Sequence, residues 1–371
     1  MRELCELPTP CYLFDEAAIK KNLARVRRLR EESGCRVLLA LKGFAAWKLF
    51  PLFRDSLRGV SASSLYEARL GAEEFGGEVH IYAPAYRAEE FAALRRYASH
   101  FIFNSRAQWR RFGENLDLPC GVRVNPGYSE VRNPLYDPCR PRSQFGVAAA
   151  DAAFIGGDNN IEGLHFHALC EQNADALARV AEKVHSRFGA VLPRMRWINF
   201  GGGHLLAAEE YDRAALAAIV RDFRARYDAE IYLEPGGGLV HECCELVASV
   251  LDVLPGGAAI LDCSASAHLP DVLETPYRPR IAGAAAAGEL AHTYRLCGPT
   301  CMAGDSFGEY SFARPLRPGA RVQICDAAAY SVVKHTTFNG VAPPSIALRR
   351  TDGGIEILRH PDYDDYRRRM S

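Results

Sequence analysis

The chain has 371 residues, 48% of them hydrophobic, and its 45 lysine and arginine residues balance 45 aspartate and glutamate residues. This length exceeds one typical domain and allows a large buried core. The zero formal net charge argues against nucleic acid or an anionic membrane as the main partner. No apolar run reaches the roughly 20 residues that cross a bilayer.

The N-terminal segment and the cysteines indicate the compartment. The segment MRELCELPTPCYLF lacks the basic start and the long apolar core of a signal peptide. Twelve cysteines are scattered along the chain without a CxxC pair, so a disulfide framework has little support. We therefore expect a cytoplasmic protein with reduced thiols.

The first predicted element is an amphipathic helix over residues 15–34. Asp15 can cap its N-terminus and Gly34 can end it, and apolar residues recur between them with the period of a helix.

Eight short apolar segments follow, and most are separated by helical patterns such as LYEARLGAEEF. They are residues 37–41, 59–63, 79–84, 101–105, 121–126, 162–168, 197–203 and 231–236. Strands that are buried on both faces of a parallel sheet have this continuous apolar character. The alternation therefore predicts an α/β fold with a (β/α)8 barrel, which we bound at residues 13–245.

The pattern changes after about residue 245. The strand-like segments are residues 246–254, 258–266, 289–298, 320–330 and 356–360, with Gly and Pro turns between them. We predict a second, mostly antiparallel β domain over residues 246–371, joined by residues 1–12. The run GAAAAG at 283–288 is expected to form a surface loop.

Candidate functional residues follow the predicted barrel strands, where active sites of barrels are built. The apolar segment VLLAL runs directly into Lys42. A lysine at a strand end is most often a solvated surface residue. A desolvated amine, however, has a lowered pKa and can form a Schiff base with an aldehyde.

Two glycine runs, FGGGH at 200–204 and EPGGG at 234–238, end neighbouring strands. Each is either a tight turn or a nest of backbone N–H groups around a phosphate. Glu234 would repel a phosphate, but it can pair with a protonated ring nitrogen. His167 is either a structural histidine or a stacking partner for a flat ring. His165 and His167 lack a third ligand with zinc spacing, so no metal site is predicted.

The loop CGPTCMAGDSF at 297–307 belongs to the second predicted domain. It is either a structural turn with a buried thiol or a reactive loop that carries Cys301 and Asp305. A Schiff-base lysine, a phosphate nest, a carboxylate for a ring nitrogen and a stacking histidine together match the needs of pyridoxal phosphate, PLP.

With these motifs the chain resembles the PLP-dependent decarboxylases of fold type III, the alanine racemase-like fold. Among them it is most similar to the carboxynorspermidine/carboxyspermidine decarboxylases, over nearly its whole length. The motifs that carry the resemblance are TPCYLFDEAAIKKNL, LALKGFA, GLHFHALCE, NFGGGH, LEPGGG, DVLETPYRP, CGPTCMAGD and HTTFNG.

The resemblance implies a role for each cofactor-binding position. Lys42 would hold PLP through a Schiff base, His167 would stack on the ring, and Glu234 would pair with its nitrogen. The phosphate would be bound by Gly202, Gly203, Gly236 and Tyr330.

The resemblance also implies a homodimer with shared active sites. Cys301 of the partner subunit would protonate the carbanion left when CO2 departs, and Asp305 would lie near the substrate. A polyamine-type substrate has a cationic tail, which needs a carboxylate within a few ångströms. The resemblance favours Asp271 for this role, and Glu274 is the second candidate.

Two departures from related branches bear on the substrate. Met302 stands where the diaminopimelate branch has an acidic residue, and EPGGG lacks the arginine of the ornithine and diaminopimelate branches. The resemblance gives no role to Arg142 in the segment PRSQFGV at 141–147. The expected reaction is decarboxylation of carboxynorspermidine, carboxyspermidine or both, giving norspermidine or spermidine in polyamine biosynthesis.

Three alternatives remain open from the sequence. One is a sister decarboxylase that acts on diaminopimelate, arginine or ornithine. Another is a PLP-binding homeostasis protein without turnover, although that class usually lacks a second β domain. The third is a phosphate-binding barrel that does not use PLP.

Overall fold

The computed structural model describes residues 6–157 and 159–371. Residues 1–5, on which part of the signal-peptide expectation rests, lie outside the described residues. The chain forms two compact units, one of residues Lys21–Leu239 and the other of Val240–Ser371 together with the chain up to Lys20. The limits of 13 and 245 drawn from the sequence stay a prediction of the domain boundaries.

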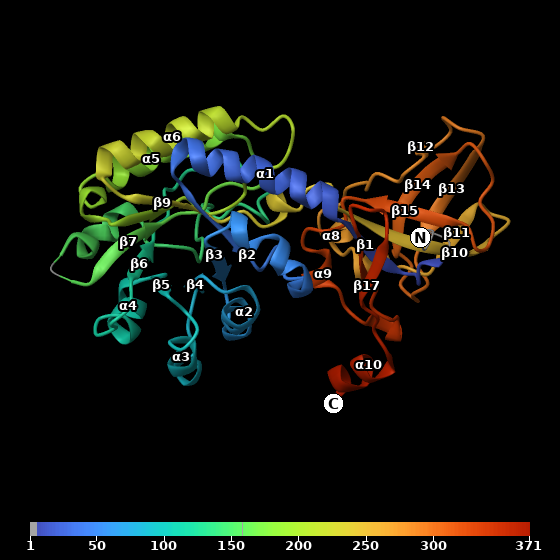
Figure 1. Ribbon diagram of the computed structural model, residues 1–371, viewed down its shortest axis with the longest axis horizontal. Helices are drawn as coiled ribbons and strands as arrows, with labels where there is room; N and C mark the ends of the chain where they lie inside the picture. Colours follow the sequence, from blue (N-terminus) through green and yellow to red (C-terminus); the bar gives the residue numbers. More distant parts are fainter. Residues whose placement is uncertain (1–5, 158) are drawn as a thin grey trace. The chain divides into compact units, whose positions relative to one another are not determined.

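The first unit is a closed barrel of eight parallel strands, coloured from blue to yellow-green in Figure 1. The strands are β2 (Arg36–Ala40), β3 (Gly59–Ala62), β4 (Glu78–Tyr82), β5 (His100–Phe103), β6 (Cys120–Arg123), β7 (Ile161–His165), β8 (Trp197–Asn199) and β9 (Glu230–Leu233). They pair in chain order, and β9 closes the barrel on β2 with Val37 opposite Leu233. Each of the eight predicted segments overlaps one strand, so the barrel prediction is confirmed.

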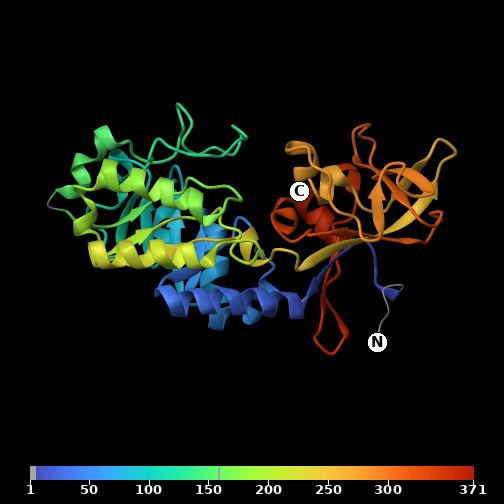
Figure 2. The same cartoon turned by 90° about the horizontal axis from the view of Figure 1, so that it is seen from above.

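Helices alternate with the strands. They are α1 (Glu16–Ser33), α2 (Leu65–Leu70), the π-helix η4 (Gly71–Phe75), α3 (Ala88–Leu94), α4 (Arg106–Phe112), α5 (Ala174–Phe188) and α6 (Arg213–Tyr227). Short 3-10 turns occupy η2 (Trp47–Leu52), η3 (Arg54–Ser56), η5 (Ala149–Gly156), η6 (Leu192–Arg194) and η7 (Gly237–Leu239). Helices α5 and α6 pack against each other along one flank of the barrel, as Figures 1 and 2 show.

Helix α1 begins and ends as its sequence predicts. The Asp15 carboxylate accepts the N–H of Ala18 at 2.9 Å, which satisfies one of the free donors of the first turn. Gly34 follows the last helical residue with φ of +73°, the left-handed conformation that ends many helices. In the described parts of the chain, the search for a helix long and apolar enough to cross a membrane found none.

The amino ends of the barrel strands enclose a polar cluster. The rings of His80 and His100 stack with centroids 3.9 Å apart, and His80 Nε2 lies 3.2 Å from the Glu78 carboxylate. Among the described residues, Glu78, His80 and His100 have the mutual spacing of metal ligands. Arg36 and Arg58 already pair with Glu78 at 3.2 and 2.7 Å, so we assign this cluster to holding the strands together.

The second unit contains a nine-stranded sheet. Its strands are β1 (Cys11–Asp15), β10 (Cys244–Val253), β11 (Ala258–Leu261), β12 (Ala284–Ala286), β13 (His292–Cys297), β14 (Ser306–Phe312), β15 (Arg321–Cys325), β16 (Ser345–Arg349) and β17 (Ile355–Arg359). The main path runs β12-β14-β13-β11-β10-β1-β16-β17, and β15 pairs with β10. Most pairs are antiparallel, which confirms the predicted second domain type, while β1–β16 and β11–β13 are parallel.

One local prediction for this unit is wrong. The run GAAAAG was expected to be a loop, but Ala284–Ala286 forms strand β12, with Ala285 opposite Ser311 of β14. A strand at the edge of a sheet is held by backbone hydrogen bonds, and small alanine side chains leave these bonds accessible.

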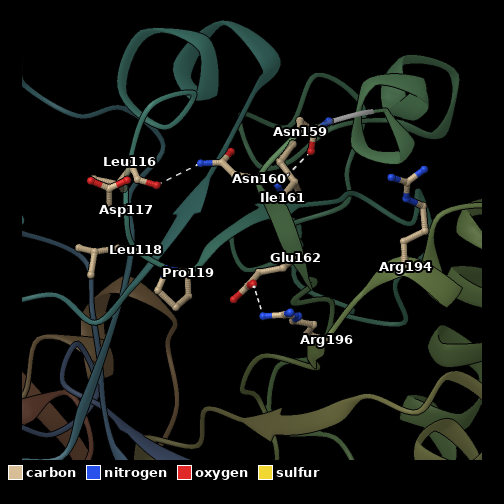
Figure 3. A pocket seen from close by; sticks show the side chains of 10 residues that line it. All are labelled: Leu116, Asp117, Leu118, Pro119, Asn159, Asn160, Ile161, Glu162, Arg194 and Arg196. Atoms are coloured by element: carbon tan, nitrogen blue, oxygen red, sulfur yellow. Dashed lines mark hydrogen bonds and ion pairs between the residues drawn. The ribbon is translucent and has the colours of Figure 1, made fainter.

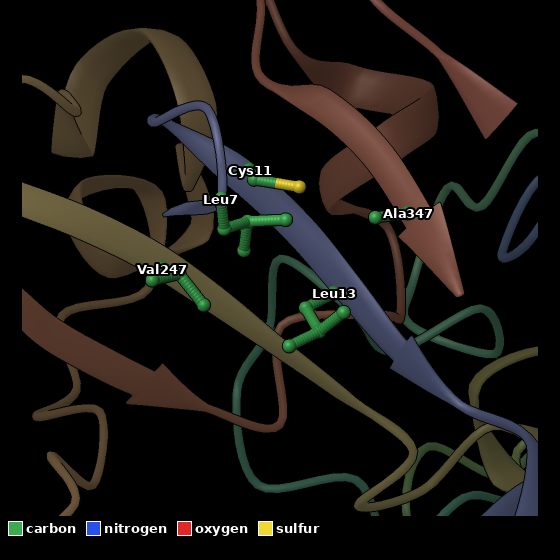
Figure 4. Close-up of a cluster of buried hydrophobic side chains, with 5 residues drawn as sticks. All are labelled: Leu7, Cys11, Leu13, Val247 and Ala347. Carbon is green, nitrogen blue, oxygen red and sulfur yellow. The ribbon is translucent and has the colours of Figure 1, made fainter. Parts of the chain in front are cut away.

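The helices of this unit are short. They are α7 (Ala265–His268), α8 (Asp271–Glu274), α9 (Ser331–Lys334), the 3-10 turn η8 (Phe338–Gly340) and α10 (Tyr363–Met370). Part of the core lies around β1, where the N-terminal strand pairs with β10 and β16 (Figure 4). The buried side chains of this cluster are Leu7, Cys11, Leu13, Val247 and Ala347.

Candidate active site

The predicted barrel residues gather at one rim. The carboxyl ends of parallel barrel strands open at the same end, and this end carries the chemistry of such barrels. Lys42 follows β2, His167 follows β7, Gly202 and Gly203 follow β8, and Glu234 follows β9.

Lys42 follows a buried strand but is itself accessible. Strand β2 and the next residue, Leu41, are buried, but the Lys42 side chain is exposed at the rim. The surrounding protein still lowers the pKa of its amine by excluding water, and the positive charge of Arg123 lowers this pKa further. The result is an accessible amine with an increased neutral fraction, which suits a nucleophile better than full burial would.

His167 is held as a neutral imidazole. The backbone N–H of Gly202 donates to His167 Nδ1 at 2.9 Å, so Nδ1 is an acceptor and the ring proton lies on Nε2. Burial, followed by the charges of Lys42 and Arg123, keeps the pKa of His167 well below its ordinary value. The Gly202 amide thus orients His167, and a contact of Gly202 with a phosphate stays a prediction.

Both glycine segments pack closely on neighbouring segments of the rim. Gly203 has φ of +86°, and a side chain there would collide with the Leu169 carbonyl oxygen, so this position requires glycine. The backbone of Gly236 packs so closely on Gly43 that a Cβ on Gly43 would lie 3.1 Å from the Gly236 Cα. Gly203 and Gly236 are therefore the positions that could hold the phosphate of the predicted cofactor.

Glu234 is held as a carboxylate. Its Oε1 accepts from Asn199 Nδ2 at 2.7 Å, and its Oε2 lies 3.5 Å from His165 Nε2. Burial alone would raise the pKa of Glu234, but His165 and Asn199 outweigh it and keep the pKa below its usual range. An ionised carboxylate at this rim could hold a protonated ring nitrogen.

Sequence analysis placed Arg123 at a strand end without giving it a role, and it missed Asn199. The guanidinium of Arg123 lies between two aromatic rings, 4.6 Å from the Tyr82 centroid and 4.7 Å from that of Phe145. Arg123 is 5% exposed, and its Nη2 donates to the His167 carbonyl oxygen at 3.4 Å. The sequence pattern that indicates a role for Arg123 is a cation inside the apolar segment GVRVNP, because burying a charge costs free energy unless the charge has specific partners.

The remaining predicted residues belong to the second unit. Cys301 carries an exposed free thiol, and its backbone N–H donates to Asn339 Oδ1 at 2.8 Å. Tyr330 precedes α9 with φ of +60°, an uncommon conformation for a non-glycine residue.

Asp305 is bonded within its own loop and unit. It is 3% exposed, and its carboxylate accepts from Ser264 Oγ at 3.0 Å and from Thr300 Oγ1 at 2.6 Å. With both oxygens bonded inside its own unit, Asp305 organises the Cys301 loop, and its predicted place near the substrate stays a prediction.

Asp271 and Glu274 share one cation. Both carboxylates accept from the Lys334 ammonium, which sequence analysis did not single out. Burial would lower the pKa of Lys334, but the two carboxylates outweigh it and raise this pKa. An ammonium group held by two carboxylates is the arrangement that the prediction required for a cationic tail, but here the cation comes from the chain itself.

A separate hollow lies at the amino ends of β6, β7 and β8 (Figure 3). Its polar wall includes the Glu162–Arg196 ion pair at 3.3 Å and the Asn160 amide, which donates to the Leu116 carbonyl oxygen at 3.2 Å. Since its side chains are engaged with each other at the end of the barrel that usually serves stability, we assign it no catalytic role.

The comparisons with known proteins agree with this geometry. No protein-family model matches the chain. The chain is 42% identical over 376 residues to the carboxyaminopropylagmatine decarboxylase of a Synechocystis species, covering 99% of this chain and 96% of the relative. It is 37% identical to the carboxynorspermidine/carboxyspermidine decarboxylase of Campylobacter jejuni, covering 97% and 98% of the two chains.

A solved structure extends the likeness to the fold. The crystal structure of carboxynorspermidine decarboxylase complexed with norspermidine, from Campylobacter jejuni, matches with a TM-score of 0.91 and 36% identity, covering 98% of this chain and 100% of that one. The resemblance drawn from the motifs is confirmed, and the chain is a decarboxylase that belongs to the family of the carboxynorspermidine/carboxyspermidine decarboxylases.

Proposed function

We propose that this decarboxylase uses PLP to remove CO2 from a carboxylated triamine, carboxynorspermidine or carboxyspermidine, and so forms norspermidine or spermidine in polyamine biosynthesis. The observation that carries the proposal is the rim on which Lys42, neutral His167 and ionised Glu234 follow three barrel strands. The full-length identity to decarboxylases of such substrates supports it.

The residues at the rim fit PLP. An accessible amine with a lowered pKa suits an aldehyde, and an uncharged imidazole suits the face of a ring. An ionised Glu234 keeps a proton on a ring nitrogen by its negative charge. When bound, PLP supplies an electron sink for the charge left by the departing CO2.

Two further groups of this chain have proposed tasks. Arg123, fixed between Tyr82 and Phe145, keeps Lys42 partly neutral and so ready to bind the cofactor aldehyde. Cys301 Sγ returns a proton to the carbon that loses CO2. We propose that Cys301 does so from the partner subunit of a homodimer with shared active sites.

The substrate tail is the second part of the proposal. Carboxynorspermidine and carboxyspermidine end in an ammonium group, and carboxyaminopropylagmatine, named for the Synechocystis relative, ends in a guanidinium group. We propose Asp271 as the tail carboxylate, with the tail sharing or replacing the Lys334 ammonium. Diaminopimelate would add a carboxylate at this end, which Asp271 and Glu274 would repel.

Reconstitution with PLP tests the cofactor assignment. The wild-type protein should show a PLP absorbance band and decarboxylate carboxynorspermidine, and Lys42→Ala should lose both. Decarboxylation at the wild-type rate by Lys42→Ala would overturn the assignment.

Steady-state kinetics test the tail assignment. Asp271→Asn should raise KM for carboxynorspermidine about tenfold, the size of one lost charge-assisted contact, with kcat nearly unchanged. Glu274→Gln is the matched control, because it removes the other carboxylate that pairs with the Lys334 ammonium. An unchanged KM in Asp271→Asn would exclude Asp271 as the tail carboxylate.

A further inference from the structure

The loop that carries Cys301, residues 298–305, is closed by Asp305. The N–H of Gly298 donates to the Asp305 carbonyl oxygen at 2.9 Å, and the N–H of Asp305 donates to the Met302 carbonyl oxygen at 3.0 Å. The Asp305 side chain bonds Thr300 and, outside the loop, Ser264. These bonds fix both ends of the loop, while Cys301 itself stands exposed at its tip.

The backbone of Cys301 is held by a residue from another segment. Its N–H donates to Asn339 Oδ1 at 2.8 Å, across 38 residues of sequence. Asn339 has φ of +56° and ψ of 15°, inside the turn η8 of the HTTFNG motif. Asparagine accepts this left-handed conformation better than most residues, and its short amide reaches a neighbouring backbone. The chain therefore holds an uncommon backbone conformation at the residue that contacts the thiol-bearing loop.

We propose that Asn339 is a positioning residue for proton return by Cys301. This inference rests on the proposed function, in which Cys301 Sγ delivers the proton. A proton donor must lie within hydrogen-bond reach of its acceptor, so a loop that shifts at Cys301 misdirects the proton. The Asn339 bond fixes the backbone from which Sγ projects and thereby selects the carbon that is protonated.

Misdirected protonation leaves a measurable product. If the proton goes to the cofactor carbon that came from the PLP aldehyde, water releases an aldehyde in place of the amine, and the cofactor leaves as pyridoxamine phosphate. Substrate and PLP then give CO2, the aldehyde and pyridoxamine phosphate, because the water used in this release replaces the water lost when the substrate amine condenses with the PLP aldehyde. The ratio of pyridoxamine phosphate to CO2 therefore reports where the proton was delivered.

Two substitutions separate the side chain of Asn339 from its backbone. Asn339→Gly tolerates the positive φ and removes the acceptor, whereas Asn339→Asp retains an acceptor. In the holoenzyme, we expect Asn339→Gly to raise the ratio of pyridoxamine phosphate to CO2 at least tenfold and Asn339→Asp to stay near the wild type. Asp228→Gly is the matched control, because Asp228 is an exposed left-handed residue of the first unit; it should leave the ratio unchanged.

Hydrogen exchange measures the bond itself without turnover. The Cys301 amide should exchange at least tenfold faster in Asn339→Gly than in the wild type and Asn339→Asp. Thermal unfolding checks that each variant is folded, and Asn339→Ser, whose side chain is shorter, replaces Asn339→Gly if that variant fails to fold. Faster exchange with an unchanged product ratio would overturn the inference.

A double substitution separates this inference from the proposed function. If Asn339 acts through the thiol, Cys301→Ala should raise the ratio by itself, and adding Asn339→Gly should raise it no further. An additional increase would contradict a role through Cys301. If Cys301→Ala leaves the ratio and the rate unchanged, the proposed proton donor is wrong, and the role of Asn339 fails with it.

Discussion

Glu234 and His167 show how two side chains at one rim are held in the protonation states that the proposed chemistry needs. Asn199 and His165 stabilise the Glu234 carboxylate, while burial and the positive charges of Lys42 and Arg123 keep His167 neutral. The states are set by neighbours on other strands, so they depend on the closed barrel and not on the local sequence.

Glu234→Gln should lower kcat about 100-fold or more, because the amide can still accept from Asn199 but cannot stabilise a protonated ring nitrogen. PLP should remain bound through Lys42, and its absorbance band should persist. Stopped-flow absorbance and CO2 release measure both properties. A kcat within threefold of the wild type would remove the ring-nitrogen role of Glu234.

Sequence alone located the residues that directly follow barrel strands. Lys42, His167 and Glu234 could be predicted because each stands next to an apolar strand. The contacts of Asn339 and Lys334 could not, since their partners are distant in sequence and only the fold brings them together. For the same reason the bonds of Asp305 to Ser264 and Thr300 could not be predicted, and its place near the substrate stays a prediction.

At the scale of single elements, helix α1 connects sequence and structure most directly. Asp15→Ala should lower the free energy of unfolding by about 1 kcal/mol, because the N–H of Ala18 loses its acceptor. Asp15→Asn keeps a side-chain oxygen and should lose less than half of that amount. Urea unfolding followed by circular dichroism measures the difference, and equal stability of Asp15→Ala and the wild type would refute the cap.

The predicted strands differ in how well the sequence marks them. Barrel strands are buried on both faces, so their apolar runs stand out between helices. Strand β12 consists of alanines at a sheet edge, and β14 has the sequence SFGEYSF, in which buried, partly buried and exposed residues follow one another without strict alternation. Strands of the second unit therefore carry weaker signals, and β1, β12, β14 and β16 were not predicted.

At the scale of the whole barrel, the polar cluster at the amino ends links stability to pH. Burial, then the neighbouring His80 and the cations Arg36 and Arg58, lower the pKa of His100 to about 3, although Glu78 opposes this. In the unfolded chain the pKa of a histidine is about 6.5. Below pH 6.5 His100 is therefore protonated in the unfolded chain but remains neutral in the folded barrel. The free energy of unfolding falls as the pH is lowered toward 3.

His100→Gln should flatten this dependence by up to about 1.4 kcal/mol per pH unit between pH 6 and pH 4. All three tryptophans, Trp47, Trp109 and Trp197, belong to the barrel unit, so urea unfolding followed by their fluorescence reports on it. Parallel curves of stability against pH for the two proteins would show that His100 does not titrate as proposed.

The proposed homodimer predicts complementation between inactive variants. Lys42→Ala and Cys301→Ala should each be nearly inactive alone, but mixed dimers would contain one intact site if the two residues come from different subunits. Random exchange at equal concentrations should restore about a quarter of the wild-type activity, since half of the dimers are mixed and each has one of two sites intact. No recovery after demonstrated subunit exchange would place both residues in the same subunit.

Decarboxylation of a carboxylated triamine is tested most directly by a product assay on the PLP-loaded wild-type protein. The substrates would be carboxynorspermidine, carboxyspermidine, carboxyaminopropylagmatine, diaminopimelate, arginine and ornithine, with the amine products identified by mass spectrometry. We predict CO2 release with formation of norspermidine or spermidine, and a kcat/KM for diaminopimelate, arginine and ornithine at least 100-fold lower. Preferred turnover of diaminopimelate, arginine or ornithine would keep the fold and family but contradict the assignment of Asp271 and the proposed substrate class.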